Sequence, residues 1–320
     1  MWFAAAGLFR RPRPTHVEIV NIPPEALHRS GFVTLVGLPN VGKSTLVNLL
    51  TGESLSIVTA RPQTTRQRVT AILTGPGHQA VFVDTPGLLQ PRYLLHESMQ
   101  EEARDGAANA DVLVYVADAG YERSLEHAAS YDPPPHSRPI LCLNKRDRVD
   151  DEAARALINR FEASAAWEAV IPTTATTGDG ADRLREAILQ RLPPGPAYYP
   201  EQEVATAPVR FFVAEKIREV CFEELGEELP YSLAVGIEQY REESEPLYIA
   251  ATIFVERESQ KGIVIGKGGR MIRKIGIRAR ASVEAFVGER VYLDLRVKVL
   301  ANWRKNPGRL KLLGYTISAR

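Results

Sequence analysis

The sequence contains little cysteine and no long apolar segment. Only Cys142 and Cys221 occur in 320 residues, and two distant cysteines predict neither a disulfide framework nor a cysteine metal site. The six histidines show no metal-ligand spacing. No run of about 18 apolar residues exists, so we expect no membrane-spanning helix. The apolar start of the chain precedes its first arginines instead of following them, which argues against a secretory signal. These absences predict a cytoplasmic protein.

An excess of one charge is also missing, since 40 Lys and Arg residues balance 39 Asp and Glu residues. With 44% apolar residues this composition excludes general disorder, and the length predicts about two domains. The charge is nevertheless unevenly spread. The stretches 261–280 and 296–311 hold seven and six basic residues and no acidic one. These acid-free stretches predict that the C-terminal part of the chain binds a polyanion.

Five short apolar segments alternate with helical patterns in the first 193 residues. Apolar runs without alternation are typical of strands that are covered by helices on both faces. We therefore predict an α/β fold with a mostly parallel sheet and helices on both faces. The expected strands are 31–37, 80–84, 111–116, 139–144 and 169–173, and the expected helices are 44–51, 95–109, 151–165 and 180–191.

This pattern stops at the proline-rich segment 193–200, which predicts a stiff linker. The segment is followed by a smaller α+β pattern, with helices expected over 208–225 and 270–287 and strands over 231–241, 247–258 and 290–300. We expect an N-terminal extension over 1–29, a nucleotide-binding domain over 30–193, a linker over 194–206, and a second domain with a basic tail over 207–320.

A phosphate-binding loop follows the first expected strand. It matches the Walker A pattern and is followed by Thr45: Gly37-Leu38-Pro39-Asn40-Val41-Gly42-Lys43-Ser44-Thr45. Backbone N–H groups of such a loop bind phosphate oxygens, and its glycines allow the close approach. We expect Lys43 to lie between the β- and γ-phosphates and the Ser44 hydroxyl to ligate Mg²⁺. The alternative is a chance match in a glycine-containing turn.

The segment Asp84-Thr85-Pro86-Gly87 closes the second expected strand. An aspartate at this place can hold Mg²⁺ through water, and the Gly87 N–H can meet a γ-phosphate. Taken alone, this tetrapeptide is also an ordinary turn. In the basic loop 61–68 before it, a threonine can reach Mg²⁺ and the γ-phosphate and be released after hydrolysis. We predict Thr65 in this role, with Thr64 as the alternative; a plain basic surface loop is the other interpretation.

The segment Asn144-Lys145-Arg146-Asp147 ends a later strand. A buried Asp147 carboxylate would accept hydrogen bonds from N1–H and the 2-amino group of guanine, which adenine lacks. A backbone N–H at Thr174-Ala175 would reach guanine O6. Three such motifs in this order, each at a strand end, predict a GTP site.

The order and spelling of the motifs resemble the translation-factor-like class of P-loop GTPases and, within it, the Era-like group. In that group an apolar residue replaces the glutamine that orients the attacking water, and Leu88 occupies that position here. The resemblance implies slow hydrolysis that depends on a positioned switch loop, and a K⁺ ion beside the phosphates that Asn40 helps to hold. Together with the motifs, it implies catalytic roles for Asn40, Lys43, Thr65, Asp84 and Gly87.

A GXXG loop lies in the first acid-free stretch. KH domains use such a loop to clamp about four nucleotides of single-stranded nucleic acid. A lone GXXG is usually a helix–helix turn, but this one follows strands and precedes a helix in the order of a type II KH domain. Trp303, an aromatic residue among cations, is expected either to stack on bases or to belong to the core. The expected RNA-binding residues are Ile263, Ile265, Gly266, Lys267, Gly268, Gly269, Arg270, Arg273, Lys274, Trp303 and Arg304.

Further segments make the resemblance closer: Tyr198-Tyr199-Pro200, Arg210-Phe211, 228–232, 297–304 and Leu313-Gly314-Tyr315. Residues 31–315 resemble the Era family of bacterial GTPases, which have a C-terminal KH domain; the proline-rich segment 121–137 departs from it. The resemblance implies GTP, GDP and Mg²⁺ as ligands, binding to 16S ribosomal RNA near its 3′ end, and assembly of the small (30S) ribosomal subunit. It also implies some peripheral association with the cytoplasmic face of the membrane; we expect a monomer.

We therefore expect a GTP-hydrolysing switch whose nucleotide state governs RNA binding, and that influence must be reciprocal. Two alternatives stay open. One is an RNA-binding assembly factor with negligible turnover. The other is a related GTPase whose C-terminal domain docks protein, which the acid-free stretches disfavour.

Overall fold

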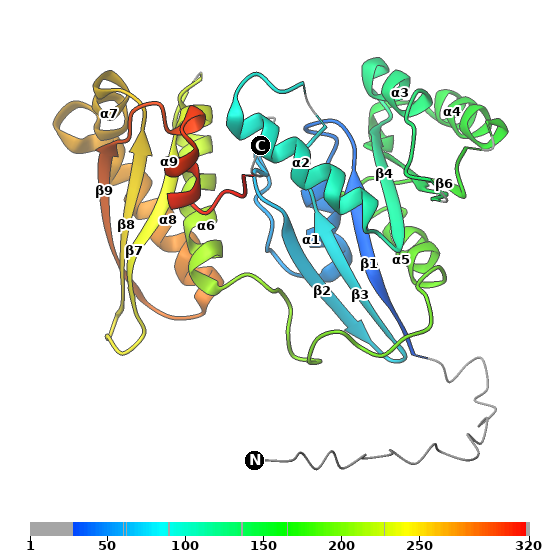
Figure 1. The fold of residues 1–320 in the computed structure, drawn as a ribbon, viewed down its shortest axis with the longest axis horizontal. Helices are drawn as coiled ribbons and strands as arrows, with labels where there is room; N and C mark the ends of the chain where they lie inside the picture. Colours follow the sequence, from blue (N-terminus) through cyan, green and yellow to red (C-terminus); the bar gives the residue numbers. More distant parts are fainter. Residues whose placement is uncertain are drawn as a thin grey trace, which may run out of the picture.

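The computed structural model describes residues 28–317 except Ala60, Pro62, Leu89, His136, Ala165 and Glu227. Our expectation for the extension 1–29 therefore lies, apart from its last two residues, outside the described residues. The described chain forms two domains that lie side by side (Figure 1). No helix in this part of the chain has the length and apolarity that crossing a membrane requires.

The first domain is built on a six-stranded sheet in the order β2-β3-β1-β4-β5-β6. Its neighbouring strands are parallel except β2 and β3, which pair antiparallel. The strands are β1 (Arg29–Val36), β2 (Val69–Gly75), β3 (His78–Asp84), β4 (Val112–Asp118), β5 (Ile140–Asn144) and β6 (Ala169–Pro172). The helices are α1 (Lys43–Thr51), α2 (Leu94–Ala108), α3 (Glu122–Ala129), α4 (Asp151–Ala163) and α5 (Ala181–Leu189).

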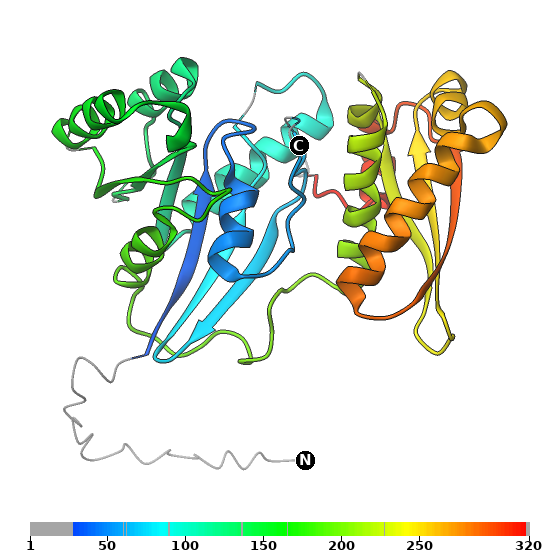
Figure 2. The same cartoon turned by 180° about the vertical axis from the view of Figure 1, so that it is seen from behind.

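Helices cover both faces of this sheet. Helix α2 lies on the face turned to the viewer in Figure 1, and α1 lies on the opposite face, seen in Figure 2. Every residue of β4 is buried, because both of its faces meet helices. The prediction of a mostly parallel α/β sheet is therefore confirmed.

Two elements of this domain were missed. Strand β2 is an edge strand that pairs only with β3 among the described strands, and a short edge strand of mixed polarity gives a weak sequence signal. Helix α3 occupies the start of the segment 121–137, before its prolines, and buries only Ser124, Leu125 and Ala128.

The linker that follows α5 runs along the first domain instead of standing free. The Gln79 side chain accepts hydrogen bonds from the N–H groups of Tyr198 and Tyr199. The Tyr198 ring stacks on Phe32 with a centroid distance of 5.4 Å. The proline-rich segment is therefore stiffened by contacts as well as by its composition.

The second domain has a three-stranded sheet in the order β7-β8-β9, in which β7 is antiparallel and β9 parallel to β8. Its helices α6 and α8 cover one face (Figure 2), and α9 lies against the other (Figure 1). The longer elements are α6 (Val209–Glu224), β7 (Ala234–Arg241), β8 (Leu247–Val255), α7 (Glu258–Ile265), α8 (Arg270–Val287), β9 (Val291–Val299) and α9 (Pro307–Leu312). Short 3₁₀ turns are η2 (Arg146–Arg148), η3 (Leu229–Ser232), η4 (Lys267–Gly269) and η5 (Trp303–Lys305). Of these elements, the helix 270–287 ends where we predicted, whereas α7 and α9 were not predicted as separate helices.

An apolar cluster joins the two domains. It contains Leu95 and Met99 of α2 together with Trp303, Leu310 and Tyr315 near the C-terminus. The segment after α9 crosses back to the first domain, where the Ser98 hydroxyl donates to the Thr316 carbonyl oxygen at 2.5 Å. The C-terminal segment therefore packs against both domains.

Candidate functional site

The phosphate loop connects the end of β1 to the start of α1, as its motif predicts. The Lys43 side chain is buried, and its ammonium donates to the carbonyl oxygens of Gly37 and Leu38 at 3.1 and 3.0 Å. Burial lowers the pKa of Lys43 to about 8, against the charge of Asp84, which raises it. The ammonium is therefore still largely protonated at pH 7 and is held inside the loop that would surround a phosphate.

Two glycines allow this loop to be tight. Gly42 has a φ of 103°, and a Cβ there would lie 2.2 Å from the side-chain nitrogen of Asn144. A Cβ on Gly87 would lie 2.6 Å from the backbone nitrogen of Pro39. The loop and the turn after β3 thus approach each other so closely that a side chain at either glycine would force them apart.

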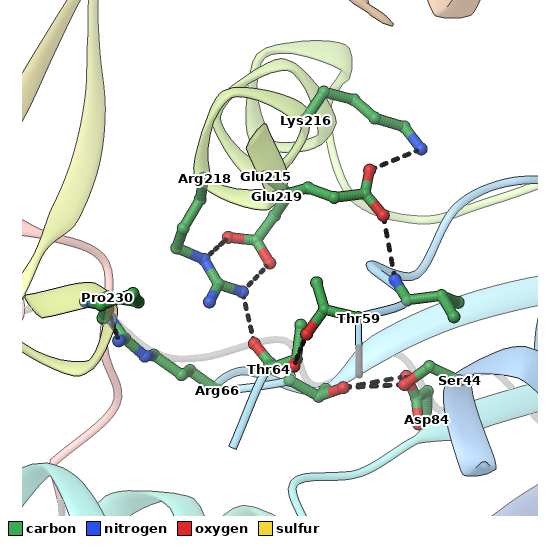
Figure 3. Close-up of polar contacts among 12 residues, drawn as sticks. Ser44, Thr59, Thr64, Arg66, Asp84, Glu215, Lys216, Arg218, Glu219 and Pro230 are labelled. Carbon is green, nitrogen blue, oxygen red and sulfur yellow. Dashed lines mark hydrogen bonds and ion pairs between the residues drawn. The ribbon is translucent and has the colours of Figure 1, made fainter. Parts of the chain in front are cut away.

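Three oxygens converge where we expect Mg²⁺. The Ser44 hydroxyl donates to Asp84 Oδ2 at 2.7 Å, and Thr65 Oγ1 lies 2.8 Å from the Ser44 oxygen and 3.4 Å from the same Asp84 oxygen. Figure 3 shows Ser44 and Asp84 side by side. Burial raises the pKa of Asp84, against the Ser44 hydrogen bond and the Lys43 charge.

This cluster fits Mg²⁺. Asp84 Oδ1 is buried and has no hydrogen-bond partner among the described residues, so the site holds an unused oxygen. No group of three or more His, Cys, Asp or Glu side chains in the described chain could hold a metal alone. One carboxylate with two hydroxyls instead suits Mg²⁺, which usually completes its shell with phosphate and water oxygens.

The geometry favours Thr65 over Thr64 as the switch threonine. The Thr64 hydroxyl donates to the Arg61 carbonyl oxygen at 2.8 Å and lies 2.7 Å from the Thr59 hydroxyl, so it is used within the loop. The Thr65 hydroxyl points to Ser44 and Asp84 instead. The alternative interpretation of 61–68 as a plain surface loop does not fit, because this loop lines the phosphate pocket.

The pocket brings most of the phosphate-binding candidates together. The predicted residues that line it are Pro39, Asn40, Gly42, Lys43, Ser44, Thr45, Thr64, Thr65 and Gly87. It also includes residues that we missed, namely Ile57, Val58, Thr59, Arg61 and Gln63. A loop without glycine or a motif gives no local signal for these contacts. The Thr85 hydroxyl, in contrast, donates to the Leu35 carbonyl oxygen at 2.7 Å and so faces β1.

The residues expected to bind the base lie at the ends of β5 and β6. The Asn144 amide donates to the Val41 carbonyl oxygen at 2.8 Å, and its oxygen accepts from the Ala175 N–H at 3.0 Å. It therefore braces the phosphate loop against the strand ends. Lys145 pairs with Asp118 at 2.9 Å. We missed Asp118, although an acidic residue at the end of β4 follows the same pattern as Asp84.

Asp147 differs from the expectation in one respect. We expected a buried carboxylate, but Asp147 is exposed because it lies in the turn that follows β5. Burial of this group would therefore have to come from the bound base itself.

The GXXG loop joins α7 to α8 with its polar residues exposed. Gly266 has a φ of 72°, and a Cβ there would lie 2.7 Å from the Met271 Cβ. Lys267, Arg270 and Arg273 are exposed, and Ile263 is 57% exposed. Lys274 is exposed as well but pairs with Glu224 at 2.5 Å. An exposed apolar side chain beside exposed cationic side chains is typical of a surface that binds nucleic acid.

Two of the expected RNA-binding residues lie elsewhere. The expectation that Trp303 stacks on bases is wrong in this structure, because the side chain is 0% exposed and its N–H donates to the Ser232 carbonyl oxygen at 2.9 Å. The core alternative is correct. Arg304 pairs with Glu256 and lies over the Tyr93 ring of the first domain at 4.9 Å, so it belongs to the contact between the domains.

Family models match both halves of the chain. One described as a 50S ribosome-binding GTPase matches residues 32–145, and one described as a KH domain matches residues 228–304. The chain is 41% identical over 290 residues to the GTPase Era of Heliobacterium modesticaldum. The aligned region covers 90% of this chain and 97% of the relative. The chain is 43% identical over 283 residues to the GTPase Era of Thermotoga petrophila, covering 87% and 94%.

Solved structures resemble the whole described arrangement. An Era variant of Aquifex aeolicus bound to GDP and aluminium fluoride superposes with a TM-score of 0.85 and 36% identity, covering 90% of this chain and 100% of the other. An Era complex with MgGDPNP and nucleotides 1506–1542 of 16S ribosomal RNA also has a TM-score of 0.85 and 36% identity, covering 91% and 100%.

Proposed function

Since this chain belongs to the Era family of GTPases, we propose that it couples GTP hydrolysis to binding of the 3′ region of 16S ribosomal RNA during assembly of the small ribosomal subunit. The observation that carries this proposal is that one loop, 54–68, contacts both the phosphate site and the KH domain. A structural change at the phosphate site can therefore be transmitted through this loop to the domain that carries the GXXG loop.

In the proposed mechanism the first domain binds GTP or GDP. The phosphate loop and Lys43 hold the phosphates, and Asp147 with the backbone at Thr174-Ala175 reads the guanine. Ser44, Thr65 and Asp84 would hold Mg²⁺, which neutralises charge on the phosphates during transfer to water. Leu88 cannot orient that water, but its N–H donates to the Gly37 carbonyl oxygen at 3.0 Å and so ties the turn after β3 to the phosphate loop. We expect slow hydrolysis that depends on the position of the switch loop.

A K⁺ ion beside Asn40 belongs to the same proposal. Asn40 is exposed, it has a φ of 63°, and its carbonyl oxygen accepts from Lys145 at 2.5 Å beside the phosphate loop. A cation there would stabilise developing charge as an arginine finger does. We expect hydrolysis to be about tenfold or more faster in K⁺ than in Na⁺, and the variant Asn40→Ala to lose the difference. Equal rates in both salts would remove this role.

The second domain supplies the RNA site. The family description names the 50S ribosome, whereas the solved Era complex contains part of 16S ribosomal RNA. Binding of the full chain to purified 16S and 23S ribosomal RNA, with GDPNP and with GDP at several salt concentrations, tests the proposal. We expect preference for 16S RNA and an affinity that depends on the nucleotide; equal binding in all four arms would contradict it. GTP turnover with and without RNA tests the alternative of negligible hydrolysis.

Charge reversal at the GXXG loop should separate the two activities. In Lys267→Glu a phosphate contact is lost and a repulsion is added, so we expect RNA affinity to fall about tenfold or more and the salt slope to fall by about one. GTP affinity measured without RNA should not change, because Lys267 is exposed on the GXXG loop and its hydrogen-bonded neighbour is Arg270, not the loop 54–68. Arg155→Glu, which makes the same change in charge on the exposed side of α4, is the matched control. Loss of both affinities would mean misfolding or a wrong domain assignment.

The cellular setting follows from these partners. A factor that acts on ribosomal RNA would work in the cytoplasm. A monomeric state and peripheral association with the cytoplasmic face of the membrane are further parts of the proposal.

A further inference from the structure

Among the described residues, hydrogen bonds join the loop 54–68 to the second domain at four points: Lys216 donates to the Ser54 hydroxyl at 3.1 Å, and three further contacts lie closer to Thr65. At the first of these three, the Val58 N–H donates to Glu219 Oε1 of α6 at 3.0 Å. At the second, the Arg218 guanidinium of α6 donates to the Thr64 carbonyl oxygen at 2.6 Å. At the third, Arg66 reaches out of the loop into the second domain. Figure 3 shows Arg218 and Glu219 extending toward the loop from the helix above it, and Arg66 extending sideways to Pro230.

Arg218 is built into α6 as a rigid donor. Its side chain is 2% exposed, and Glu215, one turn earlier on the same helix, binds it through both carboxylate oxygens. The guanidinium also lies 5.4 Å from the centre of the Phe222 ring. The same terminal nitrogen that donates to Glu215 also donates to the Thr64 carbonyl oxygen, so the pairing with Glu215 fixes the direction in which the guanidinium meets the loop.

Arg66 makes the reverse contact. It is 4% exposed, and it donates to the carbonyl oxygens of Leu233 and Pro230 at 2.7 and 2.9 Å. Thr64, the residue before Thr65, is thus bound by Arg218 of the second domain. Arg66, the residue after Thr65, binds the second domain with its own side chain. The peptide oxygen before Thr65 and the side chain after it are therefore both held by the second domain.

We propose that Arg218 is a positioning residue for GTP hydrolysis, so that the RNA-binding half of the chain completes the GTPase site in cis. The peptide bond whose oxygen Arg218 holds leads directly into Thr65. The Thr65 hydroxyl in turn lies 2.8 Å from the Ser44 oxygen and 3.4 Å from Asp84. A displacement of about 1 Å in such a group can cost about 100-fold in rate. This inference rests on the proposed function, because it assigns a task to the contact between its two halves.

The inference also gives the coupling a direction. If the KH domain must contact the loop for Thr65 to face the metal site, then GTP with Mg²⁺ favours that same domain arrangement. Loss of Arg218 should therefore weaken the effect of the KH domain on GTP hydrolysis and the effect of GTP on RNA binding together.

The test compares wild-type protein with Arg218→Gln. We expect kcat for GTP hydrolysis to fall about 10- to 100-fold and the Mg²⁺ concentration for half-maximal rate to rise, with GDP affinity unchanged. The ratio of RNA affinities in GDPNP and GDP should approach one. A purely structural role for Arg218 would lower the yield of active protein but leave the Mg²⁺ dependence of the folded fraction as in wild type.

Two further variants keep the test decisive. Arg218→Gln leaves Glu215 as an unpaired, partly buried carboxylate, so the double variant Glu215→Gln with Arg218→Gln removes both charges if the single one folds poorly. Arg278→Gln is the matched control, since Arg278 pairs with Glu223 and Glu224 inside the second domain. Wild-type kcat and Mg²⁺ dependence in a folded Arg218 variant would overturn the inference. Wild-type protein that fails to bind 16S RNA in either nucleotide state would instead overturn the proposed function.

Discussion

Replacing Asp147 with asparagine should lower GTP affinity by about 100-fold or more. The carboxylate accepts two hydrogen bonds from guanine in our proposal, and each hydrogen bond to a charged group contributes about 1.5–3 kcal/mol. An asparagine amide keeps one acceptor but turns its NH₂ group toward the 2-amino group of guanine, where two donors face each other. Xanthine has an oxygen at that place, so affinity for xanthosine triphosphate should rise. Calorimetric titration with both nucleotides measures the change.

The control for this experiment lies three residues further along the chain. Asp150 caps α4 by accepting a hydrogen bond from the Ala153 N–H at 2.8 Å. Asp150→Asn makes the same chemical change in the same loop, and asparagine is an equally good cap. We expect it to bind GTP as wild type does. If Asp147→Asn also keeps its GTP affinity, the 144–147 loop does not read the base.

Replacing Trp303 with alanine should lower the free energy of unfolding by about 3–5 kcal/mol, the usual cost of removing a buried aromatic side chain. Trp303 stacks on Tyr315 with a centroid distance of 5.9 Å, and the Arg66 guanidinium lies 5.8 Å from its ring centre. The variant therefore leaves a cavity where the C-terminal segment meets both domains. Chemical denaturation followed by circular dichroism measures the loss.

The same variant tests the core role of Trp303 in solution. A core residue affects stability, so the folded fraction of Trp303→Ala should bind RNA with nearly wild-type affinity under GDP. Trp303→Phe keeps a ring but loses the hydrogen bond to Ser232, and it should cost less than the alanine variant. Full stability together with lost RNA binding would show that Trp303 stacks on bases after all.

Much of the fold could be predicted because its signals are local. The parallel strands of the first sheet contain apolar runs, and the proline-rich segment marks the change to the second domain. Strand β2 and helix α3 were missed because their place in the fold depends on partners elsewhere in the chain: β2 pairs with β3 and meets the linker at Val204, and α3 packs on β4. An edge strand of mixed polarity and a helix of eight residues are short windows, in which a periodic pattern is weak evidence for an element.

The same distinction separates the residues of the site. Three parts of the site each consist of one short, continuous segment: the phosphate loop, the turn after β3 and the GXXG loop. Each depends on the glycines and backbone donors of that segment. Their residues can be named from spacing alone. Asn144 was named for the base, but the structure uses both ends of its amide to brace Val41 and Ala175. Which partner a polar side chain chooses depends on what packing brings near it.

The amino-acid sequence by itself determined the nucleotide motifs, the order of the two domains and the basic stretch around the GXXG loop, because these are properties of neighbouring residues. Only the tertiary structure decided that Trp303 is core and that Arg218 meets the switch loop. Arg218 and Thr64 lie 154 residues apart, and no periodicity or spacing connects positions so distant. Their contact exists because two domains, each folded by its own local signals, pack against each other at this loop.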